Sequence, residues 1–312
     1  MKSRLEDRIY TYSDYLKKKF GEKVFRVGLS TGIPCPHRIA TGGCIFCDPQ
    51  TFTGDYIRKV LSVQDQLNEI VPIIQKSCGK VKLLAYFQDE TSTAGEIAVL
   101  KEKFQSALNF PDVLGLVVST RPDYINVDIV KMLKQLEKPV TIEIGLQSVH
   151  NSSLEFLNRG HNFSQVDEAI QLCGENGLEV GVHLIMGIPG ENFEDMKKTI
   201  SYINDNEYIK LLKFHNLIVY KGTKLEKIIS KEEIINIDRY IDLMTNLLGY
   251  LRGEKVITRL FTSNISPNQV AMGNEVGNKT KWMNYLRKKM IAKGIIQGCK
   301  TNFIYKREVG NV

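Results

Sequence analysis

The stretch CPHRIATGGCIFC, residues 35–47, holds three cysteines and closely follows the apolar run KVFRVGLS, residues 23–30. Cys44 and Cys47 form a C-x2-C pair, whose two thiolates can bind one metal centre from a single turn. Cys35 can fold back over Gly42 and Gly43 to add a third thiolate. The spacing therefore predicts a metal centre with three cysteine ligands just after the first strand.

Three thiolates are an incomplete tetrahedral set, which leaves three interpretations. Zinc needs a fourth ligand, and His37 is the nearest candidate, giving a structural Cys3His site. A four-iron cluster held by three cysteines keeps its fourth iron open to a substrate or cofactor. Free thiols without a function are the third interpretation. A small zinc module does not explain a cysteine loop joined to the first strand of an enzyme-like chain of 312 residues, and this favours iron and sulfur.

Apolar, β-branched runs alternate with helical patterns along the chain. Runs typical of buried strands cover residues 23–30, 81–88, 113–120, 140–148, 178–190 and 211–220. Helical patterns lie near residues 62–76, 96–109, 126–136, 151–176, 192–206 and 231–251. This alternation predicts an α/β fold with a parallel sheet and right-handed crossovers, either doubly wound or curled into a partial or full barrel. A seventh strand candidate, residues 255–263, follows the last helix.

Polar residues cluster just past the ends of the predicted strands. These clusters are residues 88–93, residues 119–123, Gln147 with Ser148, and residues 183–191. In parallel α/β folds the carboxyl edge of the sheet is where ligands bind. We therefore expect the four clusters and the cysteine loop to converge on one site.

Composition limits the class of protein. With 43% hydrophobic and 25% charged residues, the chain is typical of a globular protein with one large core. The first 20 residues are charged throughout, and no later run approaches the roughly 20 apolar residues that cross a bilayer. We expect a cytoplasmic protein without a membrane partner, in which the six cysteines are not a disulfide framework.

Much of the net charge of +7 lies near the C-terminus, where residues 279–294 read KTKWMNYLRKKMIAKG. Their lysines and arginine can give a helix a phosphate-facing side, on which Trp282 or Tyr285 can stack on a splayed base. A solvated lysine-rich face over an apolar side explains the same pattern.

Three further segments accompany the C-x8-C-x2-C loop: EIGLQS at 143–148, LNRGH at 157–161 and HLIMGIPGE at 183–191. In this combination the sequence resembles the radical S-adenosylmethionine (radical SAM) superfamily, in particular its elongator-like branch with short YhcC/YtqA-type members. The resemblance covers roughly residues 20–300. The long gap between the first and second cysteines is a mark of this branch.

The resemblance implies a partial (β/α)6 TIM-like barrel with a C-terminal extension. It places an N-terminal helical segment at residues 1–20, the radical SAM core at 21–225, and a helical, basic extension packed on the barrel at 226–312. It also implies a 4Fe-4S cluster and S-adenosylmethionine, which one electron cleaves to give a 5′-deoxyadenosyl radical. The electron then comes from an external donor of the flavodoxin or ferredoxin type.

The resemblance carries roles to individual residues. Cys35, Cys44 and Cys47 match the cluster ligands. The positions that match contacts to S-adenosylmethionine are Phe46 and Gly187 at the adenine, Gln147 and His183 at the ribose, and Arg159 at the methionine carboxylate. The segment FQDETST, residues 87–93, replaces the GGE motif of many members, so Thr91 and Ser92 are candidates for the methionine amino group. Ser119, Arg121 and Glu143 are further candidates at the site.

The resemblance also indicates a substrate, because relatives in this branch act on the wobble uridine of tRNA. We expect a radical SAM enzyme that modifies a 5-substituted wobble uridine, for example from carboxymethylaminomethyl to aminomethyl. Acetyl transfer is disfavoured because 312 residues leave little room for an acetyltransferase domain. A radical enzyme acting on a small molecule or a protein side chain is the alternative, and a non-catalytic zinc-binding scaffold is the third hypothesis.

Overall fold

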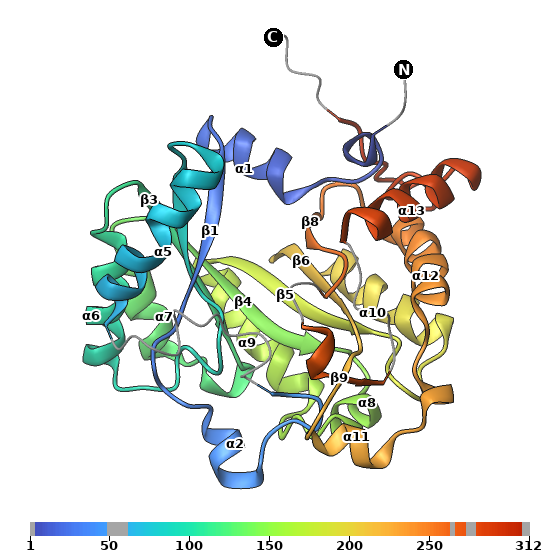
Figure 1. Ribbon diagram of the computed structural model, residues 1–312, viewed down its shortest axis with the longest axis horizontal. Helices are drawn as coiled ribbons and strands as arrows, with labels where there is room; N and C mark the ends of the chain where they lie inside the picture. Colours follow the sequence, from blue (N-terminus) through green and yellow to red (C-terminus); the bar gives the residue numbers. More distant parts are fainter. Residues whose placement is uncertain (1–3, 49–61, 263–265, 273–278, 308–312) are drawn as a thin grey trace.

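Seven strands pair in parallel in one sheet, in the order β1-β2-β3-β4-β5-β6-β8. They are β1 (Val24–Leu29), β2 (Lys82–Phe87), β3 (Val113–Thr120), β4 (Val140–Gln147), β5 (Glu179–Met186), β6 (Ile209–Asn216) and β8 (Val256–Arg259). The computed structural model describes residues 4–48, 62–262, 266–272 and 279–307, and its sheet curls into a half-barrel with helices along the outer face (Figure 1). This confirms the predicted α/β partial barrel, and β8 is the predicted seventh strand.

Helices connect the strands and cover the outside of the sheet. They are α5 (Val63–Cys78), α6 (Ile97–Leu108), α7 (Val127–Lys134), α8 (Asn151–Phe156), α9 (Phe163–Glu175), α10 (Phe193–Asp205) and α12 (Ile237–Tyr250). Several begin where a polar side chain accepts a hydrogen bond from the first turn, as Ser62 does for α5 and Asn192 for α10. Because helices cover one face of the strands and the barrel interior the other, both faces are buried and the strands read as continuous apolar runs.

The helix predicted over residues 151–176 is interrupted, so that expectation was wrong in part. The structure has α8 and α9 instead, separated by residues 157–162. Asn158 and Gly160 have positive φ angles, and Asn162 caps the start of α9 through a hydrogen bond from the Gln165 amide. The break leaves Arg159 in a loop at the carboxyl end of the sheet.

The N-terminal helix α1 (Tyr12–Phe20) lies beside the gap between the two edge strands. It contacts both β1 and β8, and the amide of Ile257 donates to the Tyr10 carbonyl just before α1. Behind it, an apolar cluster fills the amino end of the barrel; its buried members are Tyr15, Leu16, Leu84, Tyr86, Val117, Leu211 and Val256. Figure 1 shows α1 and α13 (Lys279–Ala292) at the end of the molecule opposite the short helix α2 (Pro36–Thr41).

The C-terminal helix α13 packs against α12. Its buried side chains are Trp282, Leu286 and Met290, spaced four residues apart along one face. The remaining elements are β7 (Val219–Tyr220) paired with β9 (Val270–Met272), the helix α11 (Lys224–Ile228), and the 3-10 turns Leu5–Asp7, Pro122–Tyr124, Lys231–Glu233 and Pro267–Gln269. Every helix in the described ranges is too short or too polar to span a bilayer.

Candidate active site

A cavity of about 300 Å³ opens at the carboxyl ends of the strands. Its lining comes from the cysteine loop and from the ends of strands β2 to β6 and β8, as expected for a parallel half-barrel. Of the residues predicted for the site, those that line it are Cys35, Cys44, Phe46, Cys47, Thr91, Ser119, Arg121, Gln147, Arg159 and His183. The structure thus gathers all three cysteines and most of the predicted polar residues around one space.

The cysteine loop is shaped by a short helix between its first and second cysteines. Cys35 occupies the N-cap of α2, and Gly42 ends that helix with a left-handed backbone. The Cys35 amide donates to the Glu90 carboxylate over 2.6 Å, which ties the loop to the segment after β2. Cys47 closes a turn by donating its amide to the Cys44 carbonyl over 3.1 Å. Sequence spacing alone does not reveal α2, because six residues are too few for a clear helical period.

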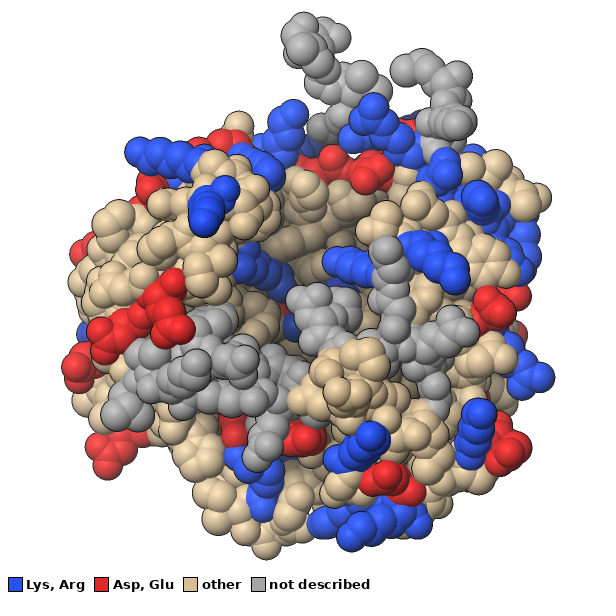
Figure 2. Space-filling model, viewed as in Figure 1, with Lys and Arg blue, Asp and Glu red and all other residues tan. Residues whose placement is uncertain are grey.

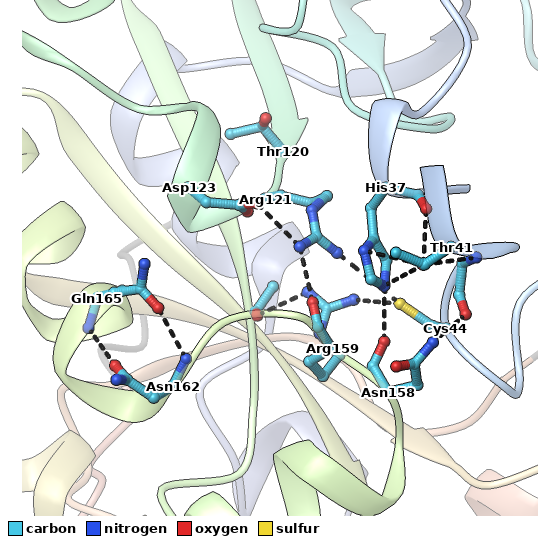
Figure 3. Close-up of polar contacts among 12 residues, drawn as sticks. His37, Thr41, Cys44, Thr120, Arg121, Asp123, Asn158, Arg159, Asn162 and Gln165 are labelled. Atoms are coloured by element: carbon cyan, nitrogen blue, oxygen red, sulfur yellow. Dashed lines mark hydrogen bonds and ion pairs between the residues drawn. The ribbon is translucent and has the colours of Figure 1, made fainter. Parts of the chain in front are cut away.

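Two arginines and one histidine surround the sulfur of Cys44 (Figure 3). Arg159 Nη1 lies 3.1 Å from Cys44 Sγ, and Arg121 Nη1 lies 3.9 Å from it. Burial alone raises the pKa of the Cys44 thiol, but the Arg159 charge, a hydrogen bond from His37 and the Arg121 charge together lower it to about 6. Cys44 is therefore prepared to be a thiolate, the form that binds metal.

His37 supports Cys44 and is not free to act as an independent ligand. Its Nε2 lies 2.7 Å from the carbonyl of Asn158, and its hydrogen bond to Cys44 raises the pKa of the imidazole. Asn158 in turn donates its side-chain amide to the Gly43 carbonyl over 2.8 Å. The loop between α8 and α9 and the cysteine loop are thus held together through His37.

The three thiols share one environment without converging on a point where a single ion would sit. Burial and the charges of Cys44 and Cys35 raise the pKa of Cys47 to about 12, which shows that the three sulfurs share one environment. Among the described residues, no three His, Cys, Asp or Glu side chains converge on one point where a metal ion would sit. Thiolates at three corners of a four-iron cluster stand farther apart than ligands of one ion, because the cluster lies between them. This geometry does not support the Cys3His zinc interpretation.

Arg159 reaches Cys44 because the strand beside it carries a glycine. The Nη2 of Arg159 donates to the Gly145 carbonyl over 3.1 Å, and a Cβ at Gly145 would lie 2.7 Å from that nitrogen. Arg121 donates to the Arg159 carbonyl over 2.7 Å and pairs with Asp123 at 2.9 Å (Figure 3). Gly145 is thus a site residue that the EIGLQS motif contains but residue-type reasoning missed.

Two lining residues carry further signs of a ligand site. Gln147 ends β4 with a φ of +64°, in the left-handed region that a residue with a Cβ seldom adopts. The Thr91 hydroxyl is buried and has no hydrogen-bond partner among the described residues. A buried hydroxyl without a partner is costly in an empty site and is satisfied when a polar ligand fills it.

Three predicted residues lie outside the described lining of the cavity. Ser92 is buried and donates its hydroxyl toward the carbonyls of Phe87 and Asp89. Gly187 has a φ of +84°, and a Cβ there would lie 2.3 Å from the Ile235 side chain, so its glycine is explained by the turn and by packing. The third residue, Glu143, lies deeper in the barrel.

Glu143 is 1% exposed and organises a layer of charged side chains inside the barrel. Its Oε2 accepts from the Tyr86 hydroxyl at 2.8 Å and from His183 at 2.7 Å, and lies 3.8 Å from Lys213 Nζ. Its Oε1 lies 2.8 Å from Arg26 Nη2. Burial raises the pKa of Glu143, but the charges of Arg26 and Lys213 and the His183 hydrogen bond hold it well below its usual range. Burial and the Lys213 charge lower the pKa of His183 to about 4, so this imidazole is neutral at pH 7.

Several residues of this layer and of the cavity wall were missed by sequence reasoning. They are Arg26, Tyr86, Lys213, His215, Asn216 and Arg259. The signal was present, since charged residues interrupt apolar strands in VFRVGL and LLKFHN. A charge in a buried strand needs a partner or a ligand, which marks such a position as part of a polar layer.

The half-barrel, the cysteine loop after β1 and the cavity at the carboxyl ends together define the class of the protein. Residues 35–203 match the family model of the Radical SAM superfamily, and the chain belongs to that superfamily. Members use a 4Fe-4S cluster and S-adenosylmethionine, and the residues around the cavity fit both.

The relatives place the chain in the elongator-like branch of that superfamily. It is 32% identical to protein MJ0486 of Methanocaldococcus jannaschii over 95% of this chain and 96% of that protein. It is 31% identical to YtqA of Bacillus subtilis over 95% of this chain and 94% of that protein. A segment covering 36% of this chain is 34% identical to part of the tRNA uridine(34) acetyltransferase of M. jannaschii, of which it covers 21%. The solved structure of Methanocaldococcus infernus Elp3 superposes with a TM-score of 0.66 and 20% identity, over 88% of this chain and 64% of that one.

Proposed function

We propose that this radical SAM enzyme modifies the 5-substituent of a wobble uridine in tRNA. The observation that carries the proposal is one cavity in which three cysteines, two arginines and the polar ends of the strands converge. The similarity to a tRNA uridine(34) acetyltransferase supports a uridine of tRNA as the substrate. That similarity covers 21% of the relative, so we take from it the nucleoside and not the acetyl transfer.

In this proposal the residues of the chain hold and orient the reactants. Cys35, Cys44 and Cys47 would hold the cluster. When bound, the cluster and S-adenosylmethionine supply a carbon-centred radical that abstracts hydrogen from the substrate. Arg159 would pair with the methionine carboxylate, for which its guanidinium fork is suited, and the unpartnered Thr91 hydroxyl would bind a polar group of the same cofactor.

The barrel also keeps water from the reaction. The apolar cluster at the amino end and α1 close one side of the interior. A second apolar cluster, which includes Ile45, Ile185, Ile188 and Leu217, lies beside the cysteine loop at the other end. Such a dry surround prevents a reactive species from being lost to solvent and strengthens the charge interactions inside.

We assign to the basic C-terminal segment only the role of a surface that faces tRNA phosphates. Trp282 is 4% exposed and its ring centroid lies 5.7 Å from that of Phe261, so it belongs to the core and does not present a face to a base. Tyr285 lies beside Lys289, with the ammonium 5.2 Å from the ring centroid. Exposed lysines of α13 such as Lys281 and Lys288 remain available to tRNA phosphates.

The test is anaerobic reconstitution of the purified chain with iron and sulfide, followed by reduction and an assay for 5′-deoxyadenosine with and without undermodified tRNA. We expect the nucleoside to form, to increase with tRNA, and to be accompanied by a mass change at the wobble uridine. Reduced flavodoxin or ferredoxin should be able to replace a chemical reductant such as dithionite as the electron source in this assay. Formation of the nucleoside without any effect of tRNA would reject the substrate and leave a small molecule or protein side chain in its place.

A further inference from the structure

The cavity carries an excess of positive charge. Among the described residues its lining includes the basic side chains of Arg38, Arg121, Arg159, Lys213 and Arg259, against the single carboxylate of Glu90. Figure 2 shows a hollow in one face of the molecule with Lys and Arg side chains around it. Low-dielectric walls of one charge concentrate the field inside a cleft, so the cavity favours anions.

Four of these five basic side chains already have a partner. Arg38 pairs with Glu90, Arg121 pairs with Asp123, Arg159 bonds Cys44 and the Gly145 carbonyl, and Lys213 contacts Tyr86 and Glu143. Arg259 differs, because it makes no hydrogen bond or ion pair with any residue in the described ranges. It is therefore the cation at which the excess charge is localised.

The position of Arg259 makes its lack of a partner costly. It ends β8, directly opposite Lys213 on β6, so two cations lie side by side on neighbouring strands. The one carboxylate of the inner layer, Glu143, is already shared among Arg26, Lys213 and His183. Burial lowers the pKa of Arg259 and the charge of Arg26 lowers it further, while Tyr86 and the shared Glu143 carboxylate only partly offset this through their charges. A half-buried guanidinium in such surroundings is stabilised when an anion binds beside it.

A second donor near the same strands also lacks an acceptor. Asn216, at the end of β6, is 2% exposed and lines the cavity. Its side-chain oxygen Oδ1 accepts a hydrogen bond from the Thr262 backbone amide over 2.9 Å, which fixes the orientation of the side chain. The Nδ2 group makes no hydrogen bond in the described part of the chain. A buried amide with one half bonded and the other unpaired is the arrangement expected beside a missing acceptor.

We propose that Arg259 and Asn216 form a subsite for an anionic group of the substrate, a carboxylate or a phosphate, at the β6–β8 side of the cavity. This subsite is separate from the cysteine side, where Arg121 and Arg159 already contact Cys44. The inference deepens the proposed function and rests on it only in placing the substrate in this cavity. A guanidinium fork can donate two hydrogen bonds to the oxygens of a carboxylate or phosphate, and an amide N–H can donate a further one.

The first experiment measures binding to the reconstituted protein by calorimetry with matched probes. The carboxylate pair is 5-carboxymethyluridine and its neutral methyl ester, and the phosphate pair is uridine 5′-monophosphate and uridine. We expect an anionic probe to bind more tightly than its neutral partner. The R259Q substitution should lower the affinity for the anionic probe roughly 10- to 100-fold. The pair that shows the difference identifies the anion as carboxylate or phosphate.

Controls separate this subsite from a general charge effect. R239Q removes an exposed arginine of α12 and should change affinity by less than about twofold. R259K keeps the charge but loses the fork, so it should retain part of the preference for the anionic probe. Equal binding of charged and neutral probes by the unchanged protein, or failure of all four probes to bind, overturns the proposal.

A second readout, without ligand, distinguishes a binding residue from a structural one. Removing a half-buried cation that lies beside other cations should raise the thermal unfolding midpoint of the ligand-free protein, whereas loss of a structural arginine should lower it. A lower midpoint for R259Q together with an unchanged preference for the anionic probe refutes the subsite. Anion binding that depends on Arg259 but no effect of tRNA on 5′-deoxyadenosine formation would reject the tRNA substrate and leave the subsite standing.

Discussion

Positive charge is compensated differently on the two sides of the cavity. On the cysteine side, Arg121 donates to the Arg159 carbonyl and to Asp123, and Arg159 donates to Cys44 and to the Gly145 carbonyl. On the β6–β8 side, Arg259 lies opposite Lys213 and feels Glu143 only through its charge, without a hydrogen bond to a residue in the described ranges. The first arrangement stabilises thiolates that belong to the chain, whereas the second needs an anion from outside. We infer that the cysteine side is organised for the cofactors and the opposite side for the substrate.

The largest effect should come from the cysteine side. Replacing Cys44 by alanine removes the ligand that Arg159 and Arg121 polarise, and we expect loss of the cluster and of all cleavage of S-adenosylmethionine. Iron content and 5′-deoxyadenosine formation measure this. Replacing the scattered Cys78 by alanine is the matched control and should leave both unchanged. Normal cleavage by C44A would falsify the assignment of the cluster.

The next largest effect should come from the layer between the two sides. Replacing Glu143 by glutamine leaves Arg26 and Lys213 buried without their carboxylate, which should reduce the free energy of unfolding by about 3–5 kcal/mol. Chemical denaturation measures the change. The control Y86F removes one hydroxyl from the same layer and should cost about 1–2 kcal/mol. Equal effects of the two substitutions would show that the carboxylate does not organise the layer.

A smaller effect should follow when Arg159 becomes lysine. The ammonium keeps the charge near Cys44 but cannot bond the sulfur, the Gly145 carbonyl and a carboxylate ligand together. We expect 5′-deoxyadenosine formation to fall roughly 10- to 100-fold while iron content is retained. The exposed R239K variant should behave as the unchanged protein. A parallel loss of iron in R159K would assign Arg159 to cluster assembly instead.

The smallest effect should depend on pH. Burial raises the pKa of Asp89 to about 6, and its Oδ1 has no partner among the described residues. Because the folded-state pKa lies above the unfolded value, the ionised aspartate destabilises the fold above about pH 6, and this cost disappears as the pH falls toward 4. D89N should therefore stabilise the ligand-free protein by about 1–3 kcal/mol at pH 8 and hardly at all at pH 4.

Denaturation curves at both pH values measure the effect of D89N. E102Q, an exposed substitution on α6, is the control and should show no such pH dependence. A stabilisation of equal size at both pH values would mean that the carboxylate charge is not its cause.

The sequence predicted the elements and the cysteine side well, for a clear physical reason. Parallel strands buried on both faces are long apolar runs, and the polar residues that follow them all meet at one edge. Thr91, Ser119, Gln147 and His183 were found in this way, and all line the cavity. Their roles toward S-adenosylmethionine, like the boundaries drawn after residues 20 and 225, stay predictions.

What the sequence did not predict lies within strands or depends on close packing. Arg26, Lys213 and Arg259 are far apart in the chain and meet only because curling brings β1, β6 and β8 around one interior. The glycine at 187 was interpreted as room for a cofactor, but Ile235 occupies the space beside it. Periodicity reports which residues are buried and not which side chain from another element faces them.

The closure of the amino end by α1 has a kinetic consequence. Helix α1 contacts both edge strands, and Tyr12 covers Arg26 with 4.1 Å between the guanidinium carbon and the ring centroid. The cavity at the carboxyl ends then offers the reactants a shared way into the interior. Of two reactants that enter there, the one that binds deeper should arrive first and leave last, so we expect an ordered binding sequence. The reactant that binds last would also cover the cavity and exclude water during the reaction.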